Sequence, residues 1–220
     1  MNIKELKALC KTNGIKGYSN KNKNELEELL YKYNNSTDNS TNLVNKGTGA
    51  GGANTNKNGL PYEGLTDLNT HIEVIKTKKD STTIKFINYD TELEKPNRKT
   101  GLFKVLKEHL DKNVEKGHGC KQPDECYINM EKKFIYIIEK KFQQTNGSVI
   151  EKLQTPEFKI WNYKKMFPDF TIVYIYCLSD YFKENAKAEL EYLEEIQIPV
   201  FWGNSESYKN DIIHFMINYK

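Results

Sequence analysis

The sequence predicts an α/β fold in which a mixed central sheet is flanked by helices, and a small helical module precedes it. Two observations support this fold class. From residue 100 onward the hydrophobic periodicity gives the order helix, strand, strand, helix, strand, helix, strand, helix. Residues 134–138 are apolar at every position, which is typical of a central strand covered on both faces. We therefore expect a helical module at 1–33, a linker at 34–60 and an α/β domain at 61–220.

Composition limits where such a protein can work. The chain has 220 residues, which usually means one or two domains. It has no apolar run long enough for a transmembrane helix and no apolar signal region at its N-terminus, so we expect no membrane partner. Its four cysteines form no regular framework and predict reduced thiols of an intracellular protein. The abundant Asn, Lys, Ile and Tyr suggest an AT-rich genome, so the location is a bacterial cytoplasm or an infected host cell.

The N-terminal module is predicted to be a pair of helices. Apolar residues follow helical spacing in two stretches, and Gly14 and Gly17 break the chain between them. The apolar positions are Ile3, Leu6, Leu9 and Cys10, then Leu26, Leu29 and Leu30. Residues 1–33 also carry seven Lys and four Glu, so the whole net charge of +3 lies on this module. A positive surface of this kind suits a polyanionic partner.

Three short motifs in this module resemble the SAP domain. They are Lys-x-Leu at 4–6, Gly-Ile-Lys-Gly-Tyr-Ser at 14–19 and Glu-Leu at 25–26. The resemblance implies a helix–turn–helix-like unit that binds duplex DNA, with Lys11, Lys16, Lys21 and Lys23 as phosphate contacts. The alternatives are a helical hairpin whose lysines only face solvent, or a module that contacts protein.

The linker and the start of the second domain come next. Residues 34–60 are rich in Asn, Ser, Thr and Gly, and as a flexible coil they would span roughly 25–30 Å. The module is therefore expected to be tethered. Residues 71–75 and 82–87 resemble strands of a hairpin with lysines at its tip, which could grip phosphates but more simply faces solvent. Residues 61–64 could bring another carboxylate, Glu63, towards a site.

A helix is expected at 101–114, because Leu102, Val105, Leu106 and Leu110 share one face. Glu108 lies off that face. It is either an additional acid of the site or an ordinary exposed helix acid. The next loop contains His118 and Cys120, with Cys126 beyond, and a zinc site there is a weak alternative because the spacing matches no standard finger.

Residues 122–143 are predicted to form a hairpin that carries the chemistry. A turn centred on residues 131–132 places Asp124 opposite Glu139, where Cβ atoms lie about 4.5–5.5 Å apart. Two carboxylates so close repel each other, so one should hold its proton unless a divalent cation binds between them. Carboxylate oxygens with several waters suit Mg²⁺. Lys141 shares the face of Glu139, Lys140 points away, and Gln143 is in phase to orient water or phosphate.

Pro123-Asp124 followed by Glu139-x-Lys141 resembles the PD-(D/E)XK nuclease superfamily, which includes many type II restriction endonucleases. The resemblance implies a restriction endonuclease-like core and Mg²⁺-dependent hydrolysis of phosphodiesters. It also implies that Asp124 and Glu139 are metal ligands and that Lys141 is the catalytic lysine. The alternative is a solvated strand end, since Glu-x-Lys occurs often in a chain with 29% charged residues.

The remaining elements complete the predicted sandwich. Ser148-x-x-Glu151 is a capping box that should start a helix, and Thr155-Pro156 should start another. Strands are expected at 171–178 and 198–202, with helices at 184–195 and 208–219.

Together these features predict a Mg²⁺-dependent DNA endonuclease. The favoured form is a sequence-specific type II restriction endonuclease that acts on double-stranded DNA as a homodimer, with a cognate DNA methyltransferase as a possible partner. The alternatives are a structure-selective repair or recombination nuclease, a non-catalytic DNA-binding scaffold and, less favoured, an RNA-acting nuclease.

Overall fold

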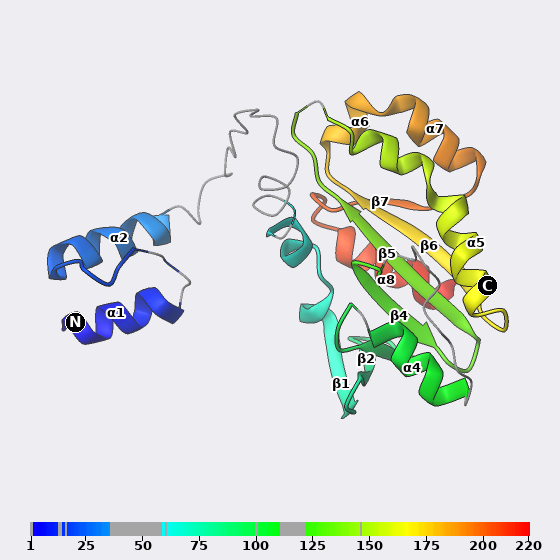
Figure 1. Ribbon diagram of the computed structural model, residues 1–220, viewed down its shortest axis with the longest axis horizontal. Coiled ribbons are helices and arrows are strands. Elements are labelled where there is room, and N and C mark those ends of the chain that lie inside the picture. Colours follow the sequence, from blue (N-terminus) through cyan, green and yellow to red (C-terminus); the bar gives the residue numbers. More distant parts are fainter. Residues whose placement is uncertain are drawn as a thin grey trace. The chain divides into compact units, whose positions relative to one another are not determined.

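The computed structural model describes residues 2–12, 15, 17–35, 59, 61–99, 101–110, 122–145 and 147–220. The chain divides into two compact units, Met1–Lys46 and Gly47–Lys220 (Figure 1). Most of the predicted linker at 34–60 lies outside the described residues, but residues 34 and 35 belong to the second helix.

The first unit contains two helices, α1 (Ile3–Thr12) and α2 (Lys23–Asn35). A reciprocal capping box starts each of them. The Glu5 amide donates to Asn2 Oδ1 at 3.0 Å, and the Asn2 amide donates to Glu5 Oε2 at 3.0 Å. Asn22 and Glu25 repeat this exchange at 3.0 and 2.8 Å. Each box satisfies two amides that a helix start leaves without a partner.

The two helices enclose a small core. Leu6, Cys10, Leu26 and Leu30 are buried against one another, as the helical spacing predicts. Gly17, between the helices, has a φ of 77°, which only glycine adopts without strain. The sequence therefore gives both the helices and the turn that separates them.

The second unit is built on a seven-stranded mixed sheet, so the predicted α/β class is confirmed. Its strands lie side by side in sequence order. They are β1 (Ile72–Thr77), β2 (Ser81–Phe86), β3 (Glu92–Pro96), β4 (Glu125–Asn129), β5 (Phe134–Lys141), β6 (Thr171–Leu178) and β7 (Val200–Trp202). Each pair of neighbours from β1 to β5 is antiparallel. The pairs β5–β6 and β6–β7 are parallel.

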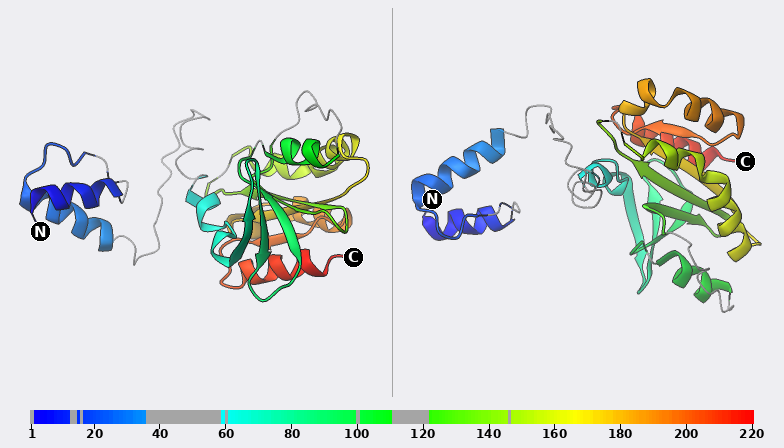
Figure 2. Two further views of the ribbon diagram at one scale, coloured as in Figure 1. Left: turned by 90° about the horizontal axis from the view of Figure 1, so that it is seen from below. Right: turned by 45° about the horizontal axis from the view of Figure 1, so that its top comes forward.

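Helices cover both faces of this sheet. They are α4 (Gly101–Leu110), α5 (Pro156–Met166), α6 (Tyr181–Asn185), α7 (Lys187–Glu195) and α8 (Tyr208–Asn218). Side chains from α4 to α7 fill one core, and α8 packs into the other with a helical turn at 61–65. The left view of Figure 2 shows the sheet between α4 and α8. In the described part of the chain, no helix has the length and apolar character needed to cross a membrane.

One local prediction was wrong. The helix expected from Ser148 is a short 3₁₀ helix, η2 (Ile150–Gln154), without a side-chain cap. Pro156 explains why this element is short, because the residue before a proline avoids the α conformation and ends a helix. A second helix then begins at Pro156, as predicted.

One glycine fixes how closely the helical turn at 61–65 approaches the sheet. Gly203 follows β7, and a Cβ atom added there would lie 2.2 Å from the Tyr62 hydroxyl oxygen and 2.9 Å from Cys177 Sγ. Tyr62 and Cys177 themselves form a buried contact at 3.5 Å. Any larger residue at 203 would therefore displace the turn.

Candidate active site

The β4–β5 hairpin has the register that the sequence predicts. Glu125 pairs with Ile138, and Asn129 pairs with Phe134 across the turn. The next position outward places Asp124 opposite Glu139. The Lys140 amide donates to Asp124 Oδ2 at 2.9 Å, which fixes this carboxylate beside β5. The structure therefore brings the two predicted acids together at the carboxyl end of a buried strand.

Glu139 lies against two lysines. Lys141 Nζ contacts Glu139 Oε1, and Lys159 Nζ lies 3.0 Å from the same oxygen. Burial acts to raise the pKa of Glu139, since only 12% of its side chain is exposed. The two ammonium groups outweigh burial and lower the pKa from 4.5 to about 2. Glu139 is consequently ionised at any physiological pH.

Asp124 behaves in the opposite way. Burial, followed by the charge of Glu139, raises its pKa above the ordinary value of 3.8. Lys141, the Lys140 amide and Lys99 partly oppose this shift. The pKa of Asp124 is therefore raised while the pKa of the neighbouring Glu139 is lowered. The rise at Asp124 includes the repulsion between the two carboxylates that the sequence predicts. Neighbouring acids with shifted pKa values are common in functional sites.

Lys159 was missed by sequence reasoning. It lies in the first turns of α5, the helix that crosses from β5 to the parallel strand β6. Such a helix begins near the carboxyl end of the strand before it, where Glu139 lies. The parallel pairing of β5 and β6 is therefore the signal that could have placed a lysine of α5 at the site.

A third carboxylate reaches Asp124 from the helical turn at 61–65. Lys99 Nζ lies 2.5 Å from Glu63 Oε2 and 3.4 Å from Asp124 Oδ1. Burial acts to lower the pKa of Lys99, but the two carboxylates raise it overall. The sequence left the place of Glu63 open, and the structure brings it beside Asp124 through this shared lysine.

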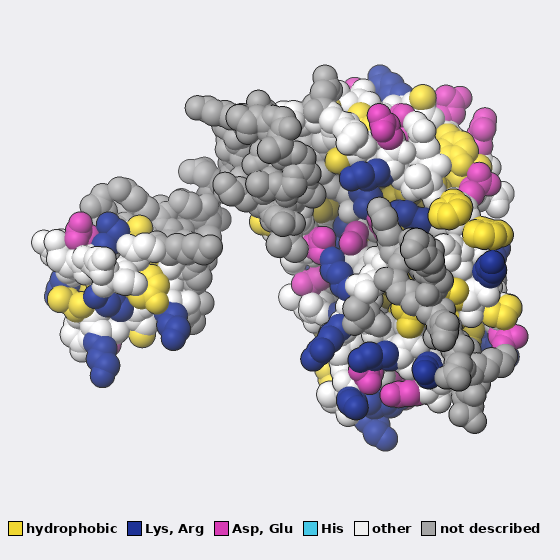
Figure 3. Space-filling model, in the orientation of Figure 1, with side chains coloured by type: hydrophobic (Ala, Val, Ile, Leu, Met, Phe, Trp, Pro, Cys, Tyr) yellow, Lys and Arg dark blue, Asp and Glu magenta, His cyan; other side chains and the backbone are white. Residues whose placement is uncertain are grey.

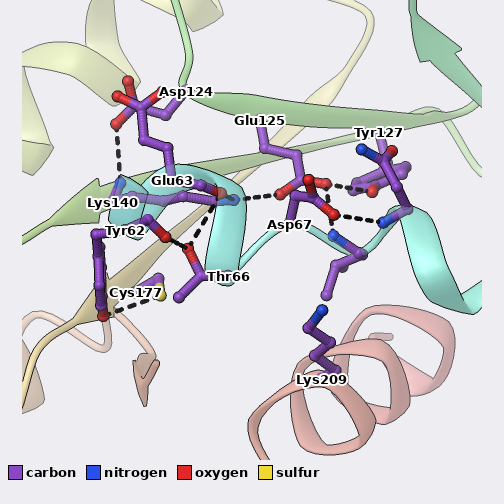
Figure 4. A network of polar contacts seen from close by, with 12 residues as sticks. Tyr62, Glu63, Thr66, Asp67, Asp124, Glu125, Tyr127, Lys140, Cys177 and Lys209 are labelled. Carbon is purple, nitrogen blue, oxygen red and sulfur yellow. Dashed lines mark hydrogen bonds and ion pairs between the residues drawn. The ribbon is translucent and has the colours of Figure 1, made fainter. Parts of the chain in front are cut away.

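The opposite face of β5 holds a buried ion pair that the sequence did not predict (Figure 4). Lys140 Nζ lies 2.8 Å from Glu125 Oε2, and the two side chains are only 3% and 6% exposed. The Tyr127 hydroxyl donates to Glu125 at 2.5 Å. Lys140 Nζ also donates to the Glu63 carbonyl at 3.1 Å. Lys140 therefore holds Asp124 with its amide and the turn that carries Glu63 with its side chain.

A pocket of about 340 Å³ is lined by Glu63, Asp124 and Glu125, whereas Glu139 and Lys141 do not line it. Charged side chains line much of it, including Glu63, Lys95, Arg98, Lys99, Asp124 and Lys140. Arg98 is the only arginine in the chain, against 32 lysines. Its exposed side chain makes no ion pair with the described residues. Arg98 thus adds a planar, bidentate donor to the wall of the pocket that Asp124 also lines.

The other two candidate residues, Gln143 and Glu108, make no described contact with Asp124 or Glu139, and only Gln143 is buried. Gln143 is buried after β5, and its side-chain amide donates to the carbonyls of Thr145 and Gly147 at 2.6 and 3.2 Å. Its side-chain oxygen is buried without a hydrogen-bond partner among the described residues. Glu108 is exposed on α4, and no contact among the described residues joins it to Asp124 or Glu139.

Of the three residues in the zinc alternative, the structure describes only Cys126. Cys126 is buried in β4 among apolar side chains, and burial raises the pKa of its thiol. His118 and Cys120 lie outside the described residues. Within the described ranges, no group of three or more His, Cys, Asp and Glu side chains is arranged to hold a metal.

The predicted DNA-contacting lysines of the first unit lie mostly on its surface. Lys11 is exposed at the end of α1. Lys21 and Lys23 form long ion pairs of 3.9 Å with Glu25 and Glu27. Surface pairs of this kind are weak, so both lysines can exchange partners. Lys16 lies outside the described residues.

Comparison with known proteins adds no relative: the chain matches no protein-family model, no curated protein and no solved structure.

Proposed function

We propose that residues 61–220 form a Mg²⁺-dependent DNA endonuclease of the PD-(D/E)XK type. The observation that carries the proposal is the pairing of Asp124 with Glu139 at the end of a buried strand, with Lys141 in contact with Glu139. This combination of residues and register is what the resemblance requires.

The acids fit a divalent cation. Asp124 and Glu139 lie opposite each other, and their mutual repulsion favours a positive charge between them. Three ammonium groups already lie against these acids. Lys141 and Lys159 contact Glu139, and Lys99 contacts Asp124 and Glu63. The carboxylates therefore already attract positive charge. Asp124 and Glu139 would hold Mg²⁺, and Glu63 would act through Lys99, which it shares with Asp124. When bound, Mg²⁺ supplies an activated water and stabilises the leaving oxygen.

The lysines then have defined tasks. Lys141 is placed to orient the attacking water or to stabilise charge that develops on the phosphate. Lys159 keeps Glu139 ionised, as its effect on the pKa indicates. The side-chain oxygen of Gln143 has no hydrogen-bond partner among the described residues, so we assign it the task of accepting a hydrogen bond from an ordered water. Lys141 and Gln143 were expected from the sequence, because they alternate with Glu139 along one strand. Lys159 comes from α5.

The first unit is proposed to bind duplex DNA in the manner of a SAP domain. Its surplus of lysines and its two-helix core support this role. The form that the sequence motif favours is a sequence-specific restriction endonuclease acting as a homodimer, with a methyltransferase that protects the same site. The second candidate is a structure-selective nuclease, which the exposed aromatic side chains on α5 favour.

The decisive experiment is cleavage of unmodified phage DNA in Mg²⁺ and in EDTA, by the natural protein and by Glu139→Ala. We expect cleavage that requires Mg²⁺ and disappears in the variant. Glu157→Ala, which removes an exposed acid of α5, is the matched control and should cleave normally. Discrete bands identify a restriction enzyme, and a smear identifies a non-specific or structure-selective nuclease. DNA binding without cleavage would instead support the scaffold alternative.

A further inference from the structure

The outer face of α5 exposes two large aromatic rings. Phe158 and Trp161 are 64% and 56% exposed. Their ring centroids lie 5.7 Å apart at an interplanar angle of 29°, so the rings are stacked. Lys165 Nζ lies 5.4 Å from the centroid of the Trp161 ring. The three residues follow the spacing i, i+3, i+7 and share one face of the helix.

This aromatic face is not explained by the core. The opposite side of α5 buries Tyr163 against the sheet, and that contact anchors the helix. In Figure 3, hydrophobic side chains gather over α5 at the right-hand side of the second unit. Exposed apolar groups that cluster, unlike single ones, mark an interaction surface.

The aromatic face belongs to the helix that supplies a lysine to the candidate active site. Phe158 directly precedes Lys159, whose ammonium group lies 3.0 Å from Glu139. DNA bound at Glu139 would therefore meet the helix that carries the two rings.

The charge of the helix favours one class of partner. α5 carries Lys159, Lys164 and Lys165 but a single acid, Glu157, which accepts a hydrogen bond from the Tyr192 hydroxyl at 2.8 Å. Lysines beside exposed rings suit a strand whose phosphates meet the cations while its bases stack on the rings. A base pair inside a duplex hides both ring faces in the helical stack, so the partner must present unpaired bases.

We propose that Phe158 and Trp161 form a stacking platform for unpaired bases of DNA, which makes single-stranded or branched DNA the substrate class. The inference rests on the proposed function for placing DNA at Glu139. It deepens that function because it selects the structure-selective form over the enzyme that reads intact duplex.

Fluorescence can test the platform without cleavage. The chain has two tryptophans, so Trp202→Phe leaves Trp161 as the single reporter. In EDTA, an oligothymidylate of fifteen residues should quench this reporter, whereas an abasic strand with equal charge should quench it much less. Trp161→Phe is the matched control. It keeps a ring at 161, so it should bind the strand while its remaining Trp202 signal stays constant.

A double variant then tests the energetic role. Phe158→Ala combined with Trp161→Ala should weaken oligothymidylate binding about fivefold or more, the loss expected for one stacked base. Affinity for a duplex of the same length should not change. Equal quenching by both strands, or unchanged affinity of the double variant, would overturn the proposal. So would sedimentation showing that the natural protein is a dimer and the double variant a monomer, because the rings would then join two copies.

These binding measurements are independent of catalysis. If the protein fails to cleave any DNA in Mg²⁺ but the Trp161 signal responds as expected, the nuclease proposal fails and the platform stands. If cleavage occurs and the signal does not respond, the platform fails alone.

Discussion

At the scale of single residues, three consecutive side chains of β5 make contacts on opposite faces of the sheet. Glu139 and Lys141 face α5, while Lys140 faces the helical turn at 61–65 and pairs with the buried Glu125. The alternation of a strand produces this division. The electrostatics follow from it, since Glu139 gains two cations and Asp124 gains mainly burial and a neighbouring negative charge.

The two acids should therefore respond oppositely to neutralisation. At pH 7 in EDTA, Glu139→Gln should lower the free energy of unfolding by up to about 3 kcal/mol, the value of a pKa shift from 4.5 to about 2. Asp124→Asn should raise it, because its raised pKa means that folding disfavours the ionised form. Urea denaturation measures both, and both variants should lose stabilisation by Mg²⁺.

The pH dependence gives a check on the same pair. The Glu139 contribution is fully present above pH 4.5 and is lost as the pH falls towards about 2. The Asp124 contribution has the opposite sign, because its raised pKa favours the folded state at low pH. A Glu139→Gln variant as stable as the natural protein at pH 7 would contradict the proposed pairing with Lys141 and Lys159.

Arg98 should matter for its shape as well as its charge. A guanidinium binds a phosphate with two parallel hydrogen bonds, which an ammonium cannot reproduce. We expect Arg98→Lys to weaken DNA binding in EDTA by about 1–2 kcal/mol, measured by fluorescence anisotropy. Lys107→Ala, which removes an exposed charge of α4, should have a smaller effect. An Arg98→Lys variant that binds DNA as tightly as the natural protein would show that Arg98 acts only as a charge.

At the scale of elements, the hairpin β4–β5 was predictable and its surroundings were not. The predicted register followed from centring the turn on residues 131–132, and the observed pairing of Glu125 with Ile138 agrees with it. Lys159 and Glu63 reach the site from elements distant in the sequence. The ion pair of Glu125 and Lys140 was missed because a charged side chain in a strand ordinarily predicts solvent, unless its partner is known.

The helical turn at 61–65 and α4 offer a direct comparison of two candidate acids. Glu63→Gln should reduce Mg²⁺-dependent cleavage about tenfold or more, because Glu63 shares Lys99 with Asp124. Glu108→Gln should leave the rate unchanged, because that side chain is exposed and has no described contact with the acids. Initial rates at several Mg²⁺ concentrations measure both. A larger effect of Glu108→Gln would reverse the assignment.

At the scale of the whole molecule, the chain places its excess positive charge and its candidate chemistry on different units. The first unit carries the surplus of lysines. The second carries the sheet, the acids and the aromatic face of α5. Such a division fits the proposed function, in which one unit would hold DNA and the other would act on it.

Removing the first unit should separate these tasks. A protein of residues 47–220 should still cleave at high DNA concentration, while its affinity for duplex DNA falls. The plot of log affinity against log salt concentration should become shallower by up to about 3–4, if all four lysines contact phosphates. In the full chain, replacing Lys11, Lys21 and Lys23 with Ala should give most of this change. An unaltered salt dependence would assign the first unit to a protein partner.

Gly203 has a genetic consequence. It lies after β7, far along the chain from every acid of the site, yet a side chain there would collide with Tyr62 and move the turn that carries Glu63. A random screen for inactive alleles should therefore recover changes at codon 203 as readily as changes at the acids. Second-site suppressors should shorten Tyr62 or Thr66, the side chains that such an allele would strike.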